Sequence, residues 1–152
     1  MDRIFNTPFE LSLRVLLILA RKNVVLTADM ITAIDFITVY GKIFGISQNN
    51  LHGDSDYKFS EFTSRRGLVN QAIKSLALDG LIDITDDGGE FLYRISERGS
   101  VYVSSLHSEY AEEYRTLGNQ TLAMFGEKPT REVVSMINKQ AVSSLRTGGQ
   151  NG

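Results

Sequence analysis

Apolar residues recur at helical spacing in the first part of the chain. Residues 7–10 read Thr-Pro-Phe-Glu, which places Thr7 at an N-cap, Pro8 at the first helical position and Glu10 three residues after the cap. Apolar side chains then follow at intervals of three and four residues. The spacing predicts a helix over residues 8–22, and the apolar run at residues 24–26 predicts a small β element.

The next segment is apolar over more than half of a helix circumference. Residues 28–44 carry isoleucine, phenylalanine, valine and tyrosine on nearly every face, which predicts a largely buried helix. Thr27 is the predicted N-cap and Gly45 the predicted C-cap. Turn-forming residues then predict a loop over residues 46–60.

Apolar and polar residues alternate after residue 80, in place of the helical spacing seen before it. A helix is predicted over residues 61–78, and strands over residues 81–85 and 91–95 flank an Asp-Asp-Gly-Gly turn, so a hairpin is expected. Ser96 is then predicted to open one long helix that ends near Phe125. A last helix is predicted to run from Thr130 to about Leu145, and the glycine-rich residues 147–152 are predicted to be disordered.

The predicted fold class is α+β, mainly helical with a small hairpin of two or three strands. Residues 76–82 read Leu-Ala-Leu-Asp-Gly-Leu-Ile, and residues 93–99 read Tyr-Arg-Ile-Ser-Glu-Arg-Gly. This sequence around the hairpin resembles the second half of a winged helix-turn-helix. We therefore expect a single winged-helix-like domain over residues 1–146, with extra helices at its C-terminal end.

Composition narrows the class of protein. The chain has 152 residues, a net charge of −2 and no cysteine, which excludes disulfides, thiolate metal sites and cysteine nucleophiles. No apolar run reaches the roughly 18 residues of a membrane span. We expect a cytoplasmic protein that does not associate with membranes.

Catalytic motifs are not found in the sequence. Neither Gly-Gly pair is followed by the Lys-Ser/Thr of a phosphate-binding loop, and no serine lies in a Gly-x-Ser-x-Gly context. His52 and His107 are far apart, and neither has neighbours at metal-ligand spacing. The prediction is a protein that is not an enzyme and that holds neither a cofactor nor a metal.

Three basic residues on the helix over 61–78 are the candidates for nucleic-acid contact. Arg65 and Arg66 lie near the start of that helix, where groove-reading proteins place base-contacting side chains, and Lys74 continues the polar face. The acidic hairpin turn opposes such contact because its carboxylates repel phosphate. The loop of about 15 residues before the helix is also longer than the usual turn of roughly 3–4 residues. Any contact with DNA is therefore expected to be weak or indirect.

The C-terminal helices carry more apolar residues than one packed face requires. A surplus of apolar surface marks a contact with another chain, either a second subunit or a second copy of this chain, and packing within the chain is the alternative. The candidate partner-binding residues are Tyr110, Tyr114, Leu117, Phe125, Val133 and Ile137.

Five short segments carry a resemblance to a known family. They are residues 3–10 (RIFNTPFE), 35–40 (DFITVY) with 44–45 (FG), 50–53 (NLHG), 59–62 (FSEF) and 78–81 (LDGL). Over roughly residues 3–115 the sequence resembles the middle component of bacterial ABC-three-component systems, and it is similar to the small accessory subunits of Lamassu-type anti-phage and anti-plasmid systems.

The resemblance implies a non-catalytic scaffold. Its implied partners are an ATPase with a long coiled coil, of the chromosome-maintenance type, and an effector such as a nuclease. The sequence leaves two alternatives open: a winged-helix transcription regulator that reads DNA as a dimer, and a structural subunit with no role at DNA. A regulator predicts a basic hairpin and a short turn, and this sequence has neither.

Overall fold

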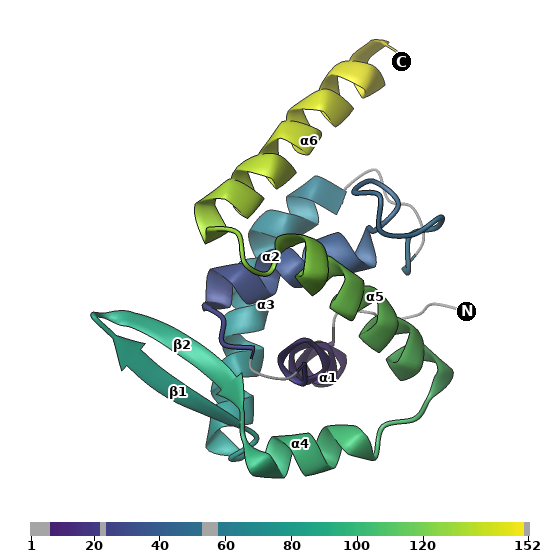
Figure 1. Cartoon of the computed structure of the whole chain (residues 1–152). Coiled ribbons are helices and arrows are strands. Elements are labelled where there is room, and N and C mark those ends of the chain that lie inside the picture. Colours follow the sequence, from purple (N-terminus) through teal and green to yellow (C-terminus); the bar gives the residue numbers. More distant parts are fainter. Residues whose placement is uncertain (1–6, 22–23, 53–57, 151–152) are drawn as a thin grey trace.

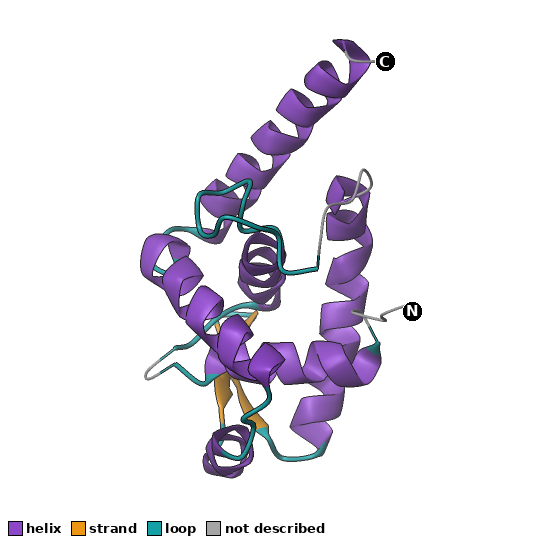
Figure 2. Ribbon diagram, turned by 90° about the vertical axis from the view of Figure 1, so that its right-hand side faces the viewer, coloured by secondary structure: helices purple, strands orange, loops and turns teal. Residues whose placement is uncertain are grey.

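The chain folds into helices around one small hairpin (Figure 1, Figure 2). The computed structural model describes residues 7–21, 24–52 and 58–150, without the side chains of residues 58, 60 and 144–150. The elements within these residues, in chain order, are α1 (Pro8–Leu19), α2 (Ala28–Val39), α3 (Lys58–Leu78), β1 (Ile82–Asp87), β2 (Glu90–Ile95), α4 (Glu97–Ser104), α5 (Glu109–Phe125) and α6 (Thr130–Gln150). The predicted α+β class is confirmed.

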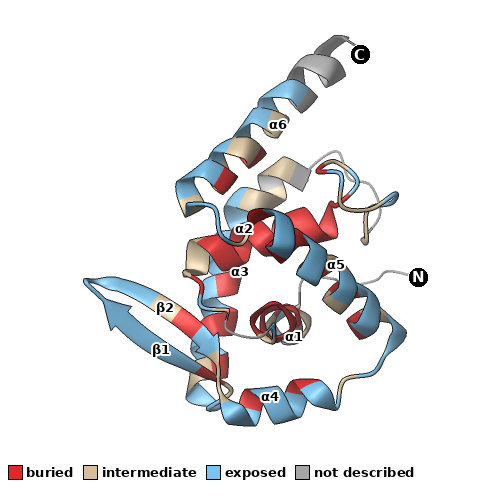
Figure 3. Ribbon diagram, in the orientation of Figure 1, coloured by how far each residue is buried: buried red, intermediate tan, exposed pale blue. Residues whose placement is uncertain are grey.

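Helices α1 and α2 form the centre of the core. Every residue of α2 from Met30 to Val39 is buried, as its apolar circumference predicts, and α1 is buried from Arg14 to Leu19. Helices α3 and α5 pack against both of them, and α6 packs against α2. Figure 3 shows this central pair as the main buried region of the molecule.

The hairpin is antiparallel, with Ile82 opposite Ile95 at its base and Asp87 opposite Glu90 at its tip. Gly88 and Gly89 form the two-residue turn, and both have the positive φ that favours glycine. The predicted β element at residues 24–26 is confirmed, because Leu26 forms an isolated bridge with Tyr93 of β2.

The second helix is shorter than its apolar spacing predicts. It ends at Val39 rather than at Phe44, and the next turns close by short-range hydrogen bonds from Ile43 to Tyr40 and from Phe44 to Gly41. Gly45 has φ 75° and lies in this turn rather than at the helix C-cap. Apolar spacing continues through the turn because Phe44 is also buried in the core.

The long helix predicted from Ser96 is two helices. Ser96 is the N-cap of α4, as predicted, but the helix ends at Ser104 and a new one begins after Ser108. The hydroxyl of Ser105 donates to the carbonyl of Tyr102, and the hydroxyl of Ser108 accepts from the amide of Ala111. Serine hydroxyls compete with the helix for backbone groups, and here they stabilise the break.

Helix α6 extends away from the body. Its first turns pack on α2 through Val133 and Ile137, and its later turns project beyond the other helices in both views (Figure 1, Figure 2). The helix continues to Gln150, which is within the stretch predicted to be disordered, while residues 151–152 lie outside the described residues. Within the described part of the chain, no helix is long and apolar enough to cross a membrane.

Candidate functional site

Five charged side chains from three helices form an ion-pair cluster with a buried centre, which we call the buried ion-pair cluster, and its two glutamates at the edge are 24% and 35% exposed. It consists of Glu10 and Arg14 on α1, Asp35 on α2, and Glu61 and Arg65 on α3. Arg14 donates from Nε and Nη2 to the two carboxylate oxygens of Asp35, at 2.8 and 2.9 Å. The hydroxyl of Tyr114 on α5 donates to Oδ1 of Asp35 at 2.5 Å. Asp35 therefore links α2 to α1 and α5.

Arg65 supplies a second cation on the other side of Asp35. Its Nη1 lies 3.3 Å from Oδ2 of Asp35, and its Nη2 lies 3.7 Å from Oε2 of Glu61. The guanidinium group also lies over the ring faces of Phe36 and Tyr40, at 5.5 and 5.9 Å from their centroids. The hydroxyl of Tyr40 donates to Glu61. The cation is thus held by two carboxylates and two aromatic rings.

The surroundings of Asp35 and Arg14 favour the charged forms of these two side chains. Burial raises the pKa of Asp35, but the nearby Arg14 and Arg65 and the hydrogen bonds from Arg14 and Tyr114 outweigh burial and hold that pKa well below its usual range. Burial lowers the pKa of Arg14, and the charge and hydrogen bonds of Asp35 outweigh it, so that pKa lies above its usual range. Burial and the Asp35 charge together raise the pKa of Tyr114, which keeps its hydroxyl a donor.

The two histidines do not form a metal site. His52 is buried against α5, where its Nε2 lies 2.5 Å from the hydroxyl of Tyr110 and 3.9 Å from Oε1 of Glu10. His107 is exposed and lies 3.5 Å from Glu112. Among the described residues, no group of three or more histidine and carboxylate side chains is placed to hold a metal ion.

The three basic residues predicted to contact nucleic acid do not share one surface role. The side chain of Arg65 is 2% exposed and belongs to the buried ion-pair cluster, so it is not presented to a phosphate. Arg66 is exposed and pairs with Asp29 at 2.8 Å. Lys74 is exposed on α3. Arg65 is buried because α3 turns this side towards Asp35.

The predicted partner-binding residues lie mostly in the core. Tyr114, Phe125, Val133 and Ile137 are buried, and Tyr110 and Leu117 are partly buried. Helix α5 packs on α1 and α2, and α6 packs on α2. The spacing of these residues therefore reflects packing within the chain, and the exposed large apolar side chains described on α5 and α6 are Met124 and Val142.

Other exposed apolar side chains line a groove between α1, α3 and α4, which we call the α1–α3–α4 groove. Its volume is about 1040 Å³. Four large apolar side chains line it with high exposure: Phe9 at 69%, Leu78 at 82%, Val101 at 67% and Tyr102 at 37%. Nine large apolar side chains are exposed among the described residues, so nearly half of them gather in this one place. This gathering of exposed apolar side chains makes the groove the candidate binding surface of the molecule.

The lining of the groove combines apolar side chains with few charges. Its charged lining residues are one acid and one base, Asp79 and Arg98, and its other polar side chains are three serines, one glutamine and Tyr102. No member of the buried ion-pair cluster lines it. In Figures 1 and 2 the α4 side of the groove lies at the end of the molecule opposite to α6.

Sequence reasoning missed both the cluster and the groove. One signal was present for the cluster. Asp35 is the only charged residue in the fully buried stretch of α2, and a buried carboxylate requires a partner. The groove left no signal, because Phe9, Leu78 and Val101 belong to three different helices.

The molecule is thus a small, mainly helical protein with a charged interior and an apolar groove on its surface. The family model of the ABC-three component (ABC-3C) system Middle Component 2 matches residues 4–147, and the chain belongs to that family. Comparison with curated proteins and with solved structures gave no significant match. The chain is therefore an accessory component of an ABC-three-component system.

Proposed function

We propose that this chain is a non-catalytic scaffold that joins an ATPase to an effector in a defence complex of the Lamassu type, directed against phage or plasmids. The ATPase would be of the chromosome-maintenance type with a long coiled coil, and the effector would be of the nuclease type. Membership of a three-component family supports the presence of such partners. We place the complex in the cytoplasm, in keeping with a chain that has no cysteine.

The fold proposed for this role is a variant of the winged helix. Helix α3 leads directly into the hairpin, and the bridge between Leu26 and Tyr93 adds a third short β element beside it. These features support the assignment. The long segment between α2 and α3 is a departure from the usual short turn.

The α1–α3–α4 groove carries the proposal. Its walls are helices, its exposed side chains are apolar, and its lining charges are one Asp and one Arg. Such a groove fits the apolar face of an amphipathic helix, which buries its anchors at intervals of three and four residues. We infer that its occupant is a helix of another component of the same system. Exposed Leu78 and Val101 would be the central contacts.

The role as a DNA-reading regulator receives less support. Arg65, the basic residue nearest to the position from which such regulators contact a DNA groove, is buried against Asp35. The hairpin turn carries Asp86, Asp87 and Glu90, whose charges repel a phosphate backbone. A scaffold, unlike a DNA-reading regulator, needs neither an exposed arginine at the start of α3 nor a basic hairpin turn.

A charge placed in the groove tests the proposal. Leu78→Glu and Val101→Glu put a carboxylate where an apolar partner face would pack, and both positions are exposed, so the fold should persist. Met124→Glu is the matched control, because Met124 is 50% exposed on α5 and does not line the groove. Each variant is mixed with the two other purified components of the system, and complex formation is followed by size-exclusion chromatography.

The expected result is loss of the complex for Leu78→Glu and Val101→Glu, with thermal unfolding close to that of the wild type. Met124→Glu should assemble like the wild type. Normal assembly of both groove variants would contradict the assignment of the groove.

A further inference from the structure

The outer half of the hairpin lies beyond the body of the protein. At its base Ile82 and Tyr93 are buried, and Tyr93 exchanges backbone hydrogen bonds with Leu26. From Asp83 to Phe91 every residue is exposed, and Figures 1 and 3 show this part extending away from the helices. A Cβ added to Gly88 or Gly89 would meet no atom within 4 Å. The hairpin tip, defined here as residues 84–91, is therefore free on all sides among the described residues.

One face of this tip carries two large apolar side chains, Ile84 and Phe91, which the described residues leave about half exposed, and Asp86 lies on the same face opposite Phe91. Ile84 lies opposite Tyr93, and Phe91 lies opposite Asp86, so Ile84 and Phe91 are diagonal neighbours on the same face. Ile84 is 49% exposed and Phe91 is 54% exposed. That face is continuous with Ile82, Tyr93 and Ile95, which pack into the protein. The tip thus extends a core face into solvent.

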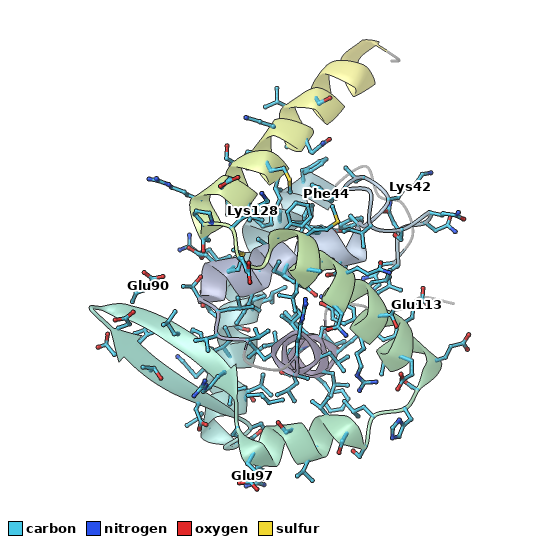
Figure 4. All side chains as sticks on the ribbon, in the orientation of Figure 1. Lys42, Phe44, Glu90, Glu97, Glu113 and Lys128 are labelled. Atoms are coloured by element: carbon cyan, nitrogen blue, oxygen red, sulfur yellow. The ribbon has the colours of Figure 1, made fainter. Side chains whose placement is uncertain are left out.

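The charge around these two side chains has a single sign. Asp86, Asp87 and Glu90 are exposed at the turn, and residues 81–93 contain no lysine, arginine or histidine. Asp83 lies opposite Arg94 and is balanced there, whereas the three turn carboxylates have no cation opposite them in the register. Figure 4 shows Glu90 at the outer part of the hairpin, on the opposite side of the molecule from Glu113 of α5.

We propose that the hairpin tip docks onto a basic protein surface with an apolar pocket, on another component of the same three-component system. Phe91 and Ile84 fill the pocket, and Asp86 pairs with a cation beside them on the same face. Asp87 and Glu90, which the register places on the other face of the turn, pair with lysines and arginines at the rim. Charge complementarity selects this occupant, because a basic surface is attracted by the tip and a nucleic acid is repelled. The inference rests on the proposed function, and it adds a second contact, separate from the α1–α3–α4 groove.

Two changes at the tip test the two parts of the proposed contact, the apolar side chain and the negative charge. Phe91→Ala removes the apolar contact, and the double change Asp87→Lys/Glu90→Lys reverses the charge. The matched controls are Met124→Ala, at a similarly exposed apolar residue, and Glu113→Lys/Glu127→Lys, which makes the same change in net charge away from the hairpin. All six changed residues are exposed, and thermal unfolding verifies the fold of each variant.

Binding to each of the two other purified components is measured by calorimetry at low and high salt. Each hairpin variant should raise the Kd by about tenfold or more, since a central aromatic contact or several paired charges are each worth at least about 1.4 kcal/mol. The controls should stay within about twofold of the wild type. Wild-type binding should weaken with salt, and the charge-reversed variant should lose that dependence.

The outcomes separate the two proposals. If the hairpin variants bind like the wild type while Leu78→Glu and Val101→Glu fail to bind, the hairpin inference is wrong and the proposed function stands. If the wild type binds neither component, both are wrong. If the chain alone forms a dimer that Phe91→Ala dissociates, the tip binds a second copy and the inference is overturned.

Discussion

Arg14 and Asp35 form a two-point ion pair in the interior, with nitrogen–oxygen distances of 2.8 and 2.9 Å between α1 and α2. Both side chains are fully buried. Two charges removed from water are costly, and only close geometry with further hydrogen bonds repays the cost. Tyr114 supplies such a bond to Asp35, and Arg65 supplies a second cation.

Removal of the Asp35 charge should destabilise the protein strongly. Asp35→Asn leaves Arg14 and Arg65 buried beside a neutral amide, which should lower the free energy of unfolding by about 3–5 kcal/mol. The control is Asp29→Asn, because the Asp29–Arg66 pair is exposed and should contribute less than about 1 kcal/mol. Urea denaturation of both variants measures the difference. Equal midpoints for the two would contradict the role of the cluster.

Stability should fall as the solution becomes acidic. The pKa of Asp35 is lower in the folded protein than in the unfolded chain, so the unfolded chain takes up this proton first as the pH falls. The contribution of the Asp35 charge is therefore complete above about pH 5 and is lost progressively below about pH 4. The gap in stability between wild type and Asp35→Asn should narrow over that range. Tyr114→Phe serves as the second variant if Asp35→Asn does not fold.

Phe36 is the aromatic centre of the second helix. Its ring lies 5.1–6.2 Å from the rings of Tyr40, Phe44, Phe59 and Phe62. Phe36→Ala should cost about 3–5 kcal/mol through lost burial and a residual cavity. The denaturation midpoint measures this cost, and Phe9→Ala at an exposed site is the control. A midpoint for Phe36→Ala equal to that of the control would show that α2 is not the centre of the core.

Binding of the isolated chain to DNA should be weak and independent of sequence. Because Arg65 is buried, Arg66 and Lys74 are the exposed basic residues that remain of the three predicted to contact nucleic acid. We therefore expect a Kd for DNA in the non-specific range of about 10⁻⁴–10⁻⁶ M at physiological salt. The double change Asp87→Lys/Glu90→Lys should tighten DNA binding, because it removes two carboxylates that repel the phosphates. Fluorescence anisotropy with short duplexes of different sequence measures this. A nanomolar, sequence-selective Kd for the wild type would favour a regulator.

Local signals in the sequence predicted the elements and most of their beginnings. Thr7, Thr27 and Ser96 accept the backbone hydrogen bonds expected of N-caps, because capping depends on residues only three positions apart. Ser108 was missed because apolar spacing continues from Val103 to Tyr110 across the break.

The candidate sites could not be predicted in the same way. Arg14 lies 21 residues before Asp35, and Arg65 lies 30 residues after it, so only the packed helices bring the three together. The apolar residues of α5 and α6 gave the spacing of an amphipathic helix, but spacing does not distinguish a core contact within the chain from a contact with a partner. The exposed apolar residues of the groove show no periodicity because they come from three different helices, with only the neighbours Val101 and Tyr102 on the same one.

The mass of the assembled complex tests the scaffold role most directly. The two other components of the system are mixed, first without this chain and then with it, and light scattering after size-exclusion chromatography measures the mass. If this chain is a scaffold, the two components should elute together only when it is present, and Leu78→Glu should abolish the joint peak. Co-elution of the two components in the absence of this chain, or a joint peak that does not contain it, would contradict the account.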